Sequence, residues 1–136
     1  MLNLFLLLQV VGAQPPENPI PPSGGSIIMR EDLPDPLEAG WEGEPVCEIL
    51  QETEDLRALR CTFPPGVGHE KHFHGPHFGY IVEGGVMEIK DRTGKKTRTL
   101  KSGASWQSDG VKWHEVLNVG DTTSVYVIVE SKGGAE

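Results

Sequence analysis

The chain has 136 residues, with 12 lysines and arginines against 20 aspartates and glutamates, and its net charge at pH 7 is −8. This length suits one ordinary domain. The acidic balance and the scattered basic residues exclude the positive surface that nucleic acids require, so we expect no nucleic-acid partner. The 11 prolines and 17 glycines fall mainly between short apolar runs, which is typical of a many-stranded β domain.

The first 13 residues, MLNLFLLLQVVGA, are apolar and end in small residues, as in a signal peptide with its cleavage site before Gln14. They are too few to cross a bilayer, which takes about 20 apolar residues, so we expect no stable membrane span. No Lys or Arg precedes the apolar run, which leaves a truncated or misassigned start as the alternative. With a signal peptide the protein is secreted or periplasmic, and without one it is cytoplasmic.

Residues 14–25, QPPENPIPPSGG, are rich in proline, which has no backbone N–H to donate to a sheet. We interpret them as an exposed arm or linker. One β domain is expected to follow over residues 26–131, and residues 132–136 are expected to form a disordered tail.

Short apolar runs alternate with Gly, Pro and Asp turns along the rest of the chain, and no segment keeps the apolar period of a helix. Without helices to cover a parallel sheet, such strands indicate a sandwich or barrel of antiparallel strands. The expected strands are 26–30, 46–52, 56–63, 71–74, 77–83, 86–91, 97–101, 114–119 and 122–130.

The two cysteines, Cys47 and Cys61, lie in neighbouring expected strands joined by the acidic turn 52–55. If this hairpin folds symmetrically about Glu54, the cysteines face each other and form a disulfide in an exported protein. Two buried free thiols are the alternative.

Four of the five histidines lie between residues 69 and 77, and the fifth is His114. Alternate residues of a strand share a face, so His72 and His74 project together and can chelate one ion. After the Gly75-Pro76 turn, His77 opens the next strand and can fold back toward them. His69 has the wrong parity for this face, and we expect it in a loop. An exposed His-x-His edge is the alternative interpretation of the pair alone.

The spacing of these residues resembles the two motifs of the cupin superfamily. The first motif is Gly, five residues, His-x-His, three or four residues, Glu, six residues and Gly; here Gly66, the pair, His77 and Gly84 follow that order. The second motif is matched by Gly103, His114 and Asn118. The resemblance spans about residues 45–130 and implies an all-β, double-stranded β-helix, the jelly-roll cupin barrel.

The resemblance also implies one divalent transition metal, Fe, Cu, Ni, Zn or Mn, held by His72, His74 and His114 with His77 as the fourth ligand. His77 departs from the family pattern because it replaces a Glu and stands one residue closer to the pair. Four neutral imidazoles favour nitrogen-loving metals over manganese or magnesium. If His77 faces outward, three histidines leave a more open coordination sphere.

Aromatic residues near the motifs are candidates for an apolar pocket that binds a small organic molecule. Core packing or contact at the strand rim is the alternative use of each. The candidates are Phe78, Tyr80, Trp106, Trp113 and Tyr126.

Proteins of this superfamily include dioxygenases, isomerases and lyases as well as proteins that bind without catalysis, so the resemblance leaves the reaction open. We expect a metal-dependent enzyme that acts on a small organic molecule, with its catalytic acid or base unidentified. The alternative is a non-catalytic secreted protein that binds metal or a small ligand. Small cupins that resemble this chain are commonly homodimers, and we expect one here.

Overall fold

The computed structural model describes residues 33–132. The expected signal peptide 1–13, the arm 14–25, the strand 26–30 and all but the first residue of the tail 132–136 lie outside the described residues. In the described part, the chain consists of strands and turns, and none of it forms a helix that is long and apolar enough to span a membrane.

Two antiparallel sheets make up the fold. The four-stranded sheet has the order β5-β10-β7-β8, and the five-stranded sheet has the order β3-β4-β11-β6-β9. The strands are β3 (Cys47–Glu52), β4 (Leu56–Phe63), β5 (Gly68–His74), β6 (His77–Glu83), β7 (Gly85–Asp91), β8 (Gly94–Leu100), β9 (Ser105–Ser108), β10 (Val111–Asn118) and β11 (Ser124–Ser131). A short pair, β1 (Gly40–Trp41) and β2 (Glu44–Pro45), precedes them.

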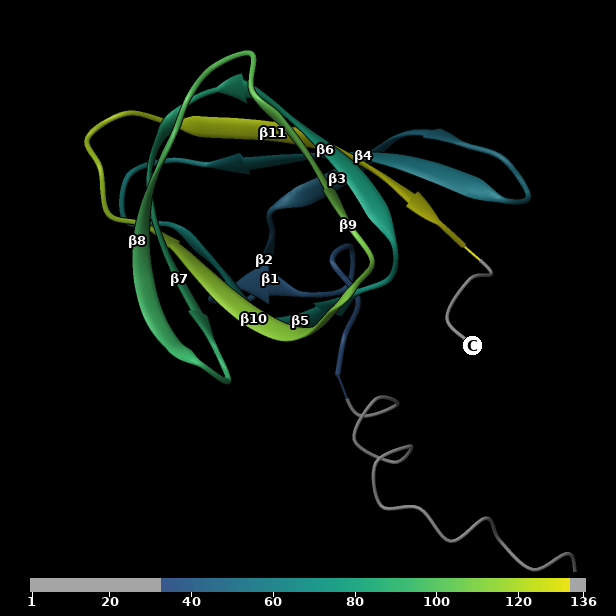
Figure 1. Cartoon of the computed structure of the whole chain (residues 1–136), viewed down its shortest axis with the longest axis horizontal. Helices are drawn as coiled ribbons and strands as arrows, with labels where there is room; N and C mark the ends of the chain where they lie inside the picture. The colour runs from purple at the N-terminus through teal and green to yellow at the C-terminus, as the bar shows by residue number, and fades with distance from the viewer. Residues whose placement is uncertain (1–32, 133–136) are drawn as a thin grey trace, which may run out of the picture.

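The two sheets curve around a common interior and form the predicted jelly-roll barrel (Figure 1). β4 and β6 have the predicted bounds, and the ends of the other expected strands within residues 33–132 shift by up to three residues. The sequence did not predict β1, β2 or β9. The first two contain only two residues each, and β9 is a short polar segment, Ser-Trp-Gln-Ser, so neither length nor hydrophobicity marks them as strands.

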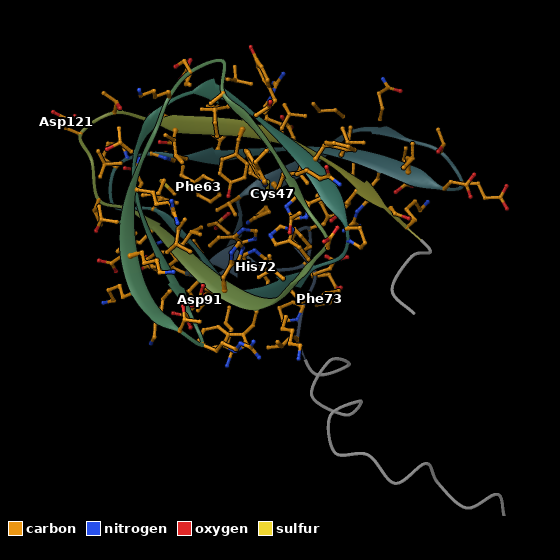
Figure 2. All side chains as sticks on the ribbon, viewed as in Figure 1. Cys47, Phe63, His72, Phe73, Asp91 and Asp121 are labelled. Atoms are coloured by element: carbon orange, nitrogen blue, oxygen red, sulfur yellow. A yellow bond between two sulfur atoms is a disulfide. The ribbon has the colours of Figure 1, made fainter. Side chains whose placement is uncertain are left out.

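Apolar side chains from both sheets fill one part of the barrel. The cluster consists of Cys47, Leu59, Cys61, Phe63, Ile81, Met87, Val116, Tyr126 and Ile128, all of which are buried. Figure 2 shows Cys47, Phe63 and His72 within the barrel, whereas Asp121 lies on an outer loop. Burial of this cluster is the main source of the fold's stability.

The two cysteines are bonded to each other. Cys47 is opposite Cys61 in the β3–β4 hairpin, as the symmetric hairpin predicts, and the structure contains the Cys47–Cys61 disulfide. The alternative, two buried free thiols, is therefore not observed. Both residues belong to the apolar cluster, so the disulfide ties the edge strand β3 directly to the core.

Candidate metal centre

Three of the predicted metal ligands converge at one point inside the barrel. His72 and His74 lie two residues apart on β5, and His114 is paired with His72 across the neighbouring strand β10. The Nε2 atoms of His72, His74 and His114 lie 3.0 Å from one another in all three pairs. The structure thus brings the two motifs together as a triangle of imidazole nitrogens.

Irregular pairing between β5 and β10 aims these side chains inward. Between His74 and His72 the chain advances two positions along β5, while the paired positions on β10 advance three. Between His72 and His69 it advances three positions along β5, while the paired positions on β10 advance two. Each count difference is a β-bulge, which bends the strand and redirects the adjacent side chains. The bulges therefore flank the His72–His114 pair on both sides.

Backbone contacts fix which nitrogen of His72 can bind a metal. His72 Nδ1 donates to the carbonyl oxygen of Glu70 at 2.6 Å. A carbonyl only accepts, so in the neutral ring the proton is on Nδ1 and Nε2 keeps its lone pair. The same kind of contact orients metal-binding histidines in other proteins.

Burial keeps the three rings neutral. Desolvation and, to a smaller extent, the neighbouring histidines lower the pKa of His72 to about 2 and the pKa of His114 to about 4. The pKa of His74 is also well below its usual value, mainly because of burial. Neutral imidazole is the form that binds metal, so the site is ready to bind an ion at neutral pH without losing protons.

These residues fit a divalent transition ion. Lone pairs that converge at 3.0 Å repel one another unless a proton or a cation lies between them, and one ion satisfies all three nitrogens. A metal–nitrogen bond of about 2.0–2.1 Å allows a single ion to reach the three atoms. Three protein ligands are fewer than such an ion takes, so positions remain for a ligand.

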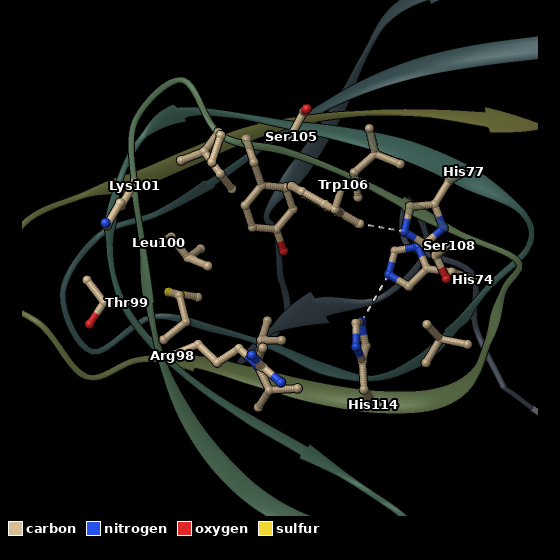
Figure 3. Close-up of a pocket in the computed structure, with 18 residues that line it drawn as sticks. His74, His77, Arg98, Thr99, Leu100, Lys101, Ser105, Trp106, Ser108 and His114 are labelled. Atoms are coloured by element: carbon tan, nitrogen blue, oxygen red, sulfur yellow. Dashed lines mark hydrogen bonds between the residues drawn. The ribbon is translucent and has the colours of Figure 1, made fainter.

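The fourth predicted ligand, His77, lies beside this group but has other partners. Its ring is 4.8 Å from the His74 ring. Its Nδ1 donates to the carbonyl oxygen of Gly75 at 2.8 Å, and its Nε2 accepts the Trp106 N–H at 3.2 Å (Figure 3). Both ring nitrogens are therefore occupied by the protein, and the group of histidines that can share an ion is His72, His74 and His114.

Trp106 holds His77 in this position from the edge strand β9. The indole packs directly over Gly79 of β6, where any Cβ would collide with the ring. A larger residue at this position would push Trp106 outward and break its hydrogen bond to His77. This packing explains why a glycine interrupts an otherwise apolar strand.

The prediction that His69 lies in a loop is wrong. His69 belongs to β5, is 1% exposed and stacks on the His72 ring with a centroid distance of 3.7 Å. The parity argument failed because the β-bulge adds a residue between His69 and His72, which places both rings inside. Its Nε2 donates to the carbonyl oxygens of Pro36 and Ala39, and burial lowers its pKa to about 4.

An ionic network positions the turn that holds His69. Asp35 Oδ1 accepts the N–H groups of Leu37 and Glu38, and its other oxygen lies 2.9 Å from Arg57 Nη2. Arg57 also bonds to Glu130 of β11. The turn at residues 35–39 is thereby tied to β4 and β11, which keeps its carbonyl groups against His69 behind the metal ligands.

An apolar cavity of about 570 Å³ opens beside the three histidines. His74 and His114 form part of its wall, and the surface of the wall is mostly apolar (Figure 3). This volume lies within the range of small-molecule sites. The residues that line the cavity contain no Asp or Glu within the described part of the chain.

The predicted pocket residues divide into two groups. Trp106 and Tyr126 line the cavity, and burial raises the pKa of Tyr126, so its hydroxyl stays protonated at neutral pH. Phe78 and Tyr80 do not line it: they are 62% and 50% exposed, because His77 and Ile81 take the inward positions of β6.

Trp113 also lies outside the cavity. It is adjacent to the inward-facing His114 on β10 and so points to the opposite face, where the Lys71 ammonium is 4.3 Å from its ring centroid. The sequence reasoning missed Arg98, which does line the cavity. Arg98 lies two residues before the half-buried Leu100 and so shares its face of β8, which is the signal that could have placed Arg98 at the cavity.

Solved structures with the same fold include a cupin domain from Bordetella pertussis Tohama I. It is 25% identical to this chain with a TM-score of 0.61, and the match covers 65% of this chain and 93% of that one. A conserved double-stranded β-helix protein from Klebsiella pneumoniae is 24% identical with a TM-score of 0.52, covering 70% of this chain and 83% of that one.

A third structure is the polyketide cyclase RemF from Streptomyces resistomycificus, which is 17% identical with a TM-score of 0.55 over 79% of each chain. No model of a protein family matches the sequence, and no curated protein does. The barrel, the two histidine motifs joined across β5 and β10, and these structural neighbours together give the assignment. The chain belongs to the cupin superfamily.

Proposed function

We propose that this cupin is a metal-dependent enzyme that converts a small organic molecule. The observation that carries this proposal is the triangle of Nε2 atoms, 3.0 Å apart, at the wall of a 570 Å³ apolar cavity. A structural metal site is usually closed by four protein ligands, whereas a catalytic site keeps a position for substrate. The hydrogen bond from Trp106 to His77 leaves three histidines for the ion, which favours the open, catalytic type of site.

His72, His74 and His114 would hold the ion, and His69 would support His72 from behind by stacking. A divalent transition ion held there would supply Lewis-acid chemistry at an oxygen atom of the substrate. The apolar walls exclude water from the substrate. Tyr126, which keeps its proton, can donate a hydrogen bond to a substrate oxygen from the cavity wall.

The fold is compatible with this proposal. RemF is by its name an enzyme that acts on polyketides, and it shares the fold of this chain over 79% of each protein. At 17% identity this likeness concerns the fold, so the reaction type, whether dioxygenase, isomerase or lyase, is left to experiment.

A turnover screen tests the proposal. The full chain would be loaded separately with Fe(II), Cu(II), Ni(II), Zn(II) and Mn(II) and offered small organic acids, phenols, ketones and sugars. We expect turnover with at least one ion, loss of turnover on chelation, and loss in His114→Ala. Thr97→Ala, on the outer face of β8, is the control and should keep full activity.

Two outcomes of the screen have different meanings. Metal-independent turnover that survives in His114→Ala would contradict the metal-dependent enzyme. Tight metal binding without turnover of any compound would instead support the alternative, a secreted protein that binds metal or a small ligand without catalysis.

We further propose that the chain forms a homodimer through the outer face of the five-stranded sheet. This face exposes Phe78, Tyr80 and Val82 of β6, and Val129 of β11 is paired with Phe78. Contiguous exposed apolar side chains of this kind mark interaction surfaces. Sedimentation velocity should give a dimer for the wild type and for the control Thr97→Asp, and a monomer for Phe78→Asp; a wild-type monomer would contradict the proposal.

We also propose export to an oxidising compartment. The Cys47–Cys61 disulfide supports this, because such bonds persist mainly in secreted and periplasmic proteins. Fractionation of the native host should recover the protein outside the cytoplasm with the disulfide formed. Recovery in the cytoplasm with two free thiols would contradict it.

A further inference from the structure

The cavity has the opposite charge to the rest of the molecule. The chain carries a net charge of −8, yet the described residues that line the cavity contain no carboxylate. Two of them, Arg98 and Lys101, have basic side chains. A cavity that lacks acidic side chains in an acidic protein favours an anionic ligand.

Arg98 is the cation that faces the cavity. It is paired with Met87 across β7 and β8, and residues that are directly opposite in an antiparallel pair share a face of the sheet. Met87 is 1% exposed in the interior, so Arg98 also projects to the inner side. Figure 3 shows its guanidinium extending from β8 into the cavity, whereas the Lys101 amine points away from it.

The guanidinium has no acidic partner within the described part of the chain. The ion pairs found there involve Arg57, Arg60, Lys95 and Lys132. Arg98 is exposed to solvent and also lines the cavity, which places it at the mouth of the cavity. Arginine is suited to this role because its planar fork binds a carboxylate through two parallel hydrogen bonds.

We propose that Arg98 binds the carboxylate of an organic acid whose apolar body fills the cavity beside the three histidines. This inference rests on the proposed function, since it names the substrate class of the same site. The lining also bears on the rest of the ligand. Its surface is mostly apolar and includes Trp106 and Tyr126, so it fits an aromatic or alicyclic body better than a sugar, most of whose hydroxyls would face apolar wall.

The probe for this experiment is 2-naphthoate, with naphthalene-2-carboxamide as its neutral counterpart of the same shape. Binding would be measured by isothermal titration to the full-length protein as purified, with its metal content determined, and to the same protein after chelation. The variants are Arg98→Met, which keeps an unbranched stem but removes the charge, and Arg98→Lys. Arg92→Met is the matched control, because it makes the same substitution at an exposed arginine between β7 and β8 that does not line the cavity.

We expect 2-naphthoate to bind wild type and Arg92→Met with similar affinity, and to bind Arg98→Met about tenfold or more weakly, as for loss of a charge-assisted hydrogen bond. Arg98→Lys should lie between them, because it keeps the charge without the planar fork. The carboxamide should bind all four proteins weakly and with no dependence on residue 98.

Equal affinity of wild type and Arg98→Met for 2-naphthoate would overturn the inference, as would an equal loss in Arg92→Met. Failure to bind the probe in any protein would overturn it as well. The chelated arm separates this inference from the proposed function. If the protein binds no metal, the proposed enzyme fails while the Arg98-dependent binding persists; if binding requires the ion and ignores Arg98, only the inference fails.

Discussion

At the scale of single residues, His72 and His77 are held alike but have different roles. In both rings Nδ1 donates to the carbonyl oxygen two residues earlier, so Nε2 is the free acceptor. The Nε2 of His72 faces two other histidines, whereas the Nε2 of His77 receives the Trp106 N–H. The partner of Nε2, and not the spacing in the sequence, therefore distinguishes a ligand from its neighbour.

Replacement of single histidines should rank their contributions to metal affinity. His114→Ala removes one of three ligands and should weaken metal binding by at least about a hundredfold, because the binding free energy of such sites is shared among few ligands. His77→Ala should weaken it by less than about tenfold. Dissociation constants for Zn(II) and Ni(II), measured by competition with a chelator, give the ranking.

Trp106→Phe is the matched control for this series, since it frees the His77 Nε2 and leaves the three ligands in place. Its metal affinity should equal or exceed that of the wild type. A His77→Ala variant that loses metal as completely as His114→Ala would show that His77 is a ligand and that its contact with Trp106 is broken in the loaded protein.

The buried histidines should make the metal-free protein sensitive to acid. The pKa values of His69 and His114 are about 4 in the folded chain, mainly through desolvation, against about 6.5 when unfolded. Between these values the unfolded state binds more protons, so stability falls as pH drops, by up to about 1.4 kcal/mol per pH unit for each such histidine. Above pH 6.5 this contribution is complete.

Urea unfolding at pH 7.5 and pH 5.5 in the presence of a chelator measures this effect. The wild type should have a clearly lower free energy of unfolding at pH 5.5, and the difference between the two pH values should be smaller in His69→Phe, which cannot take up the proton. Equal stability at both pH values would contradict buried neutral histidines.

At the scale of secondary-structure elements, departures from regular strands build the site. The bulges between β5 and β10 turn His69, His72 and His114 toward the interior. The β3–β4 hairpin, by contrast, places Cys47 opposite Cys61 in the symmetric manner that the sequence predicted. Regular pairing can be anticipated from alternation, whereas a bulge depends on tertiary packing and has no clear local signature here.

Reduction of the Cys47–Cys61 disulfide should destabilise the fold. The bond closes a loop of about 15 residues, and by the chain-entropy estimate its loss should lower the free energy of unfolding by about 3 kcal/mol. The wild type compared with and without reductant gives this value without changing the volume of a core side chain. Intact mass after alkylation confirms the state of the thiols, and an unchanged free energy after reduction would contradict the prediction.

At the scale of the whole molecule, the sequence predicted the antiparallel barrel and the three histidines that meet inside it. The barrel was predicted from the pattern of short apolar runs and turns. The spacing of the two motifs predicted that the histidines of β5 and β10 meet. The sequence could not place Phe78 and Tyr80, because an aromatic residue on a strand is compatible with either face until the register is known. Nor did it reveal the role of Trp106 in occupying His77, which depends on β9, a strand too short and polar to predict.

The metal content of the protein tests the central claim most directly. Elemental analysis of gently purified full-length chain, followed by titration with Zn(II), Fe(II), Cu(II) and Ni(II), should give about one divalent ion per chain, bound by neutral histidines. A variant with His72→Ala and His114→Ala together should bind none. Less than about a tenth of an equivalent in the wild type, with no uptake of any of these ions on titration, would contradict a metal centre at His72, His74 and His114.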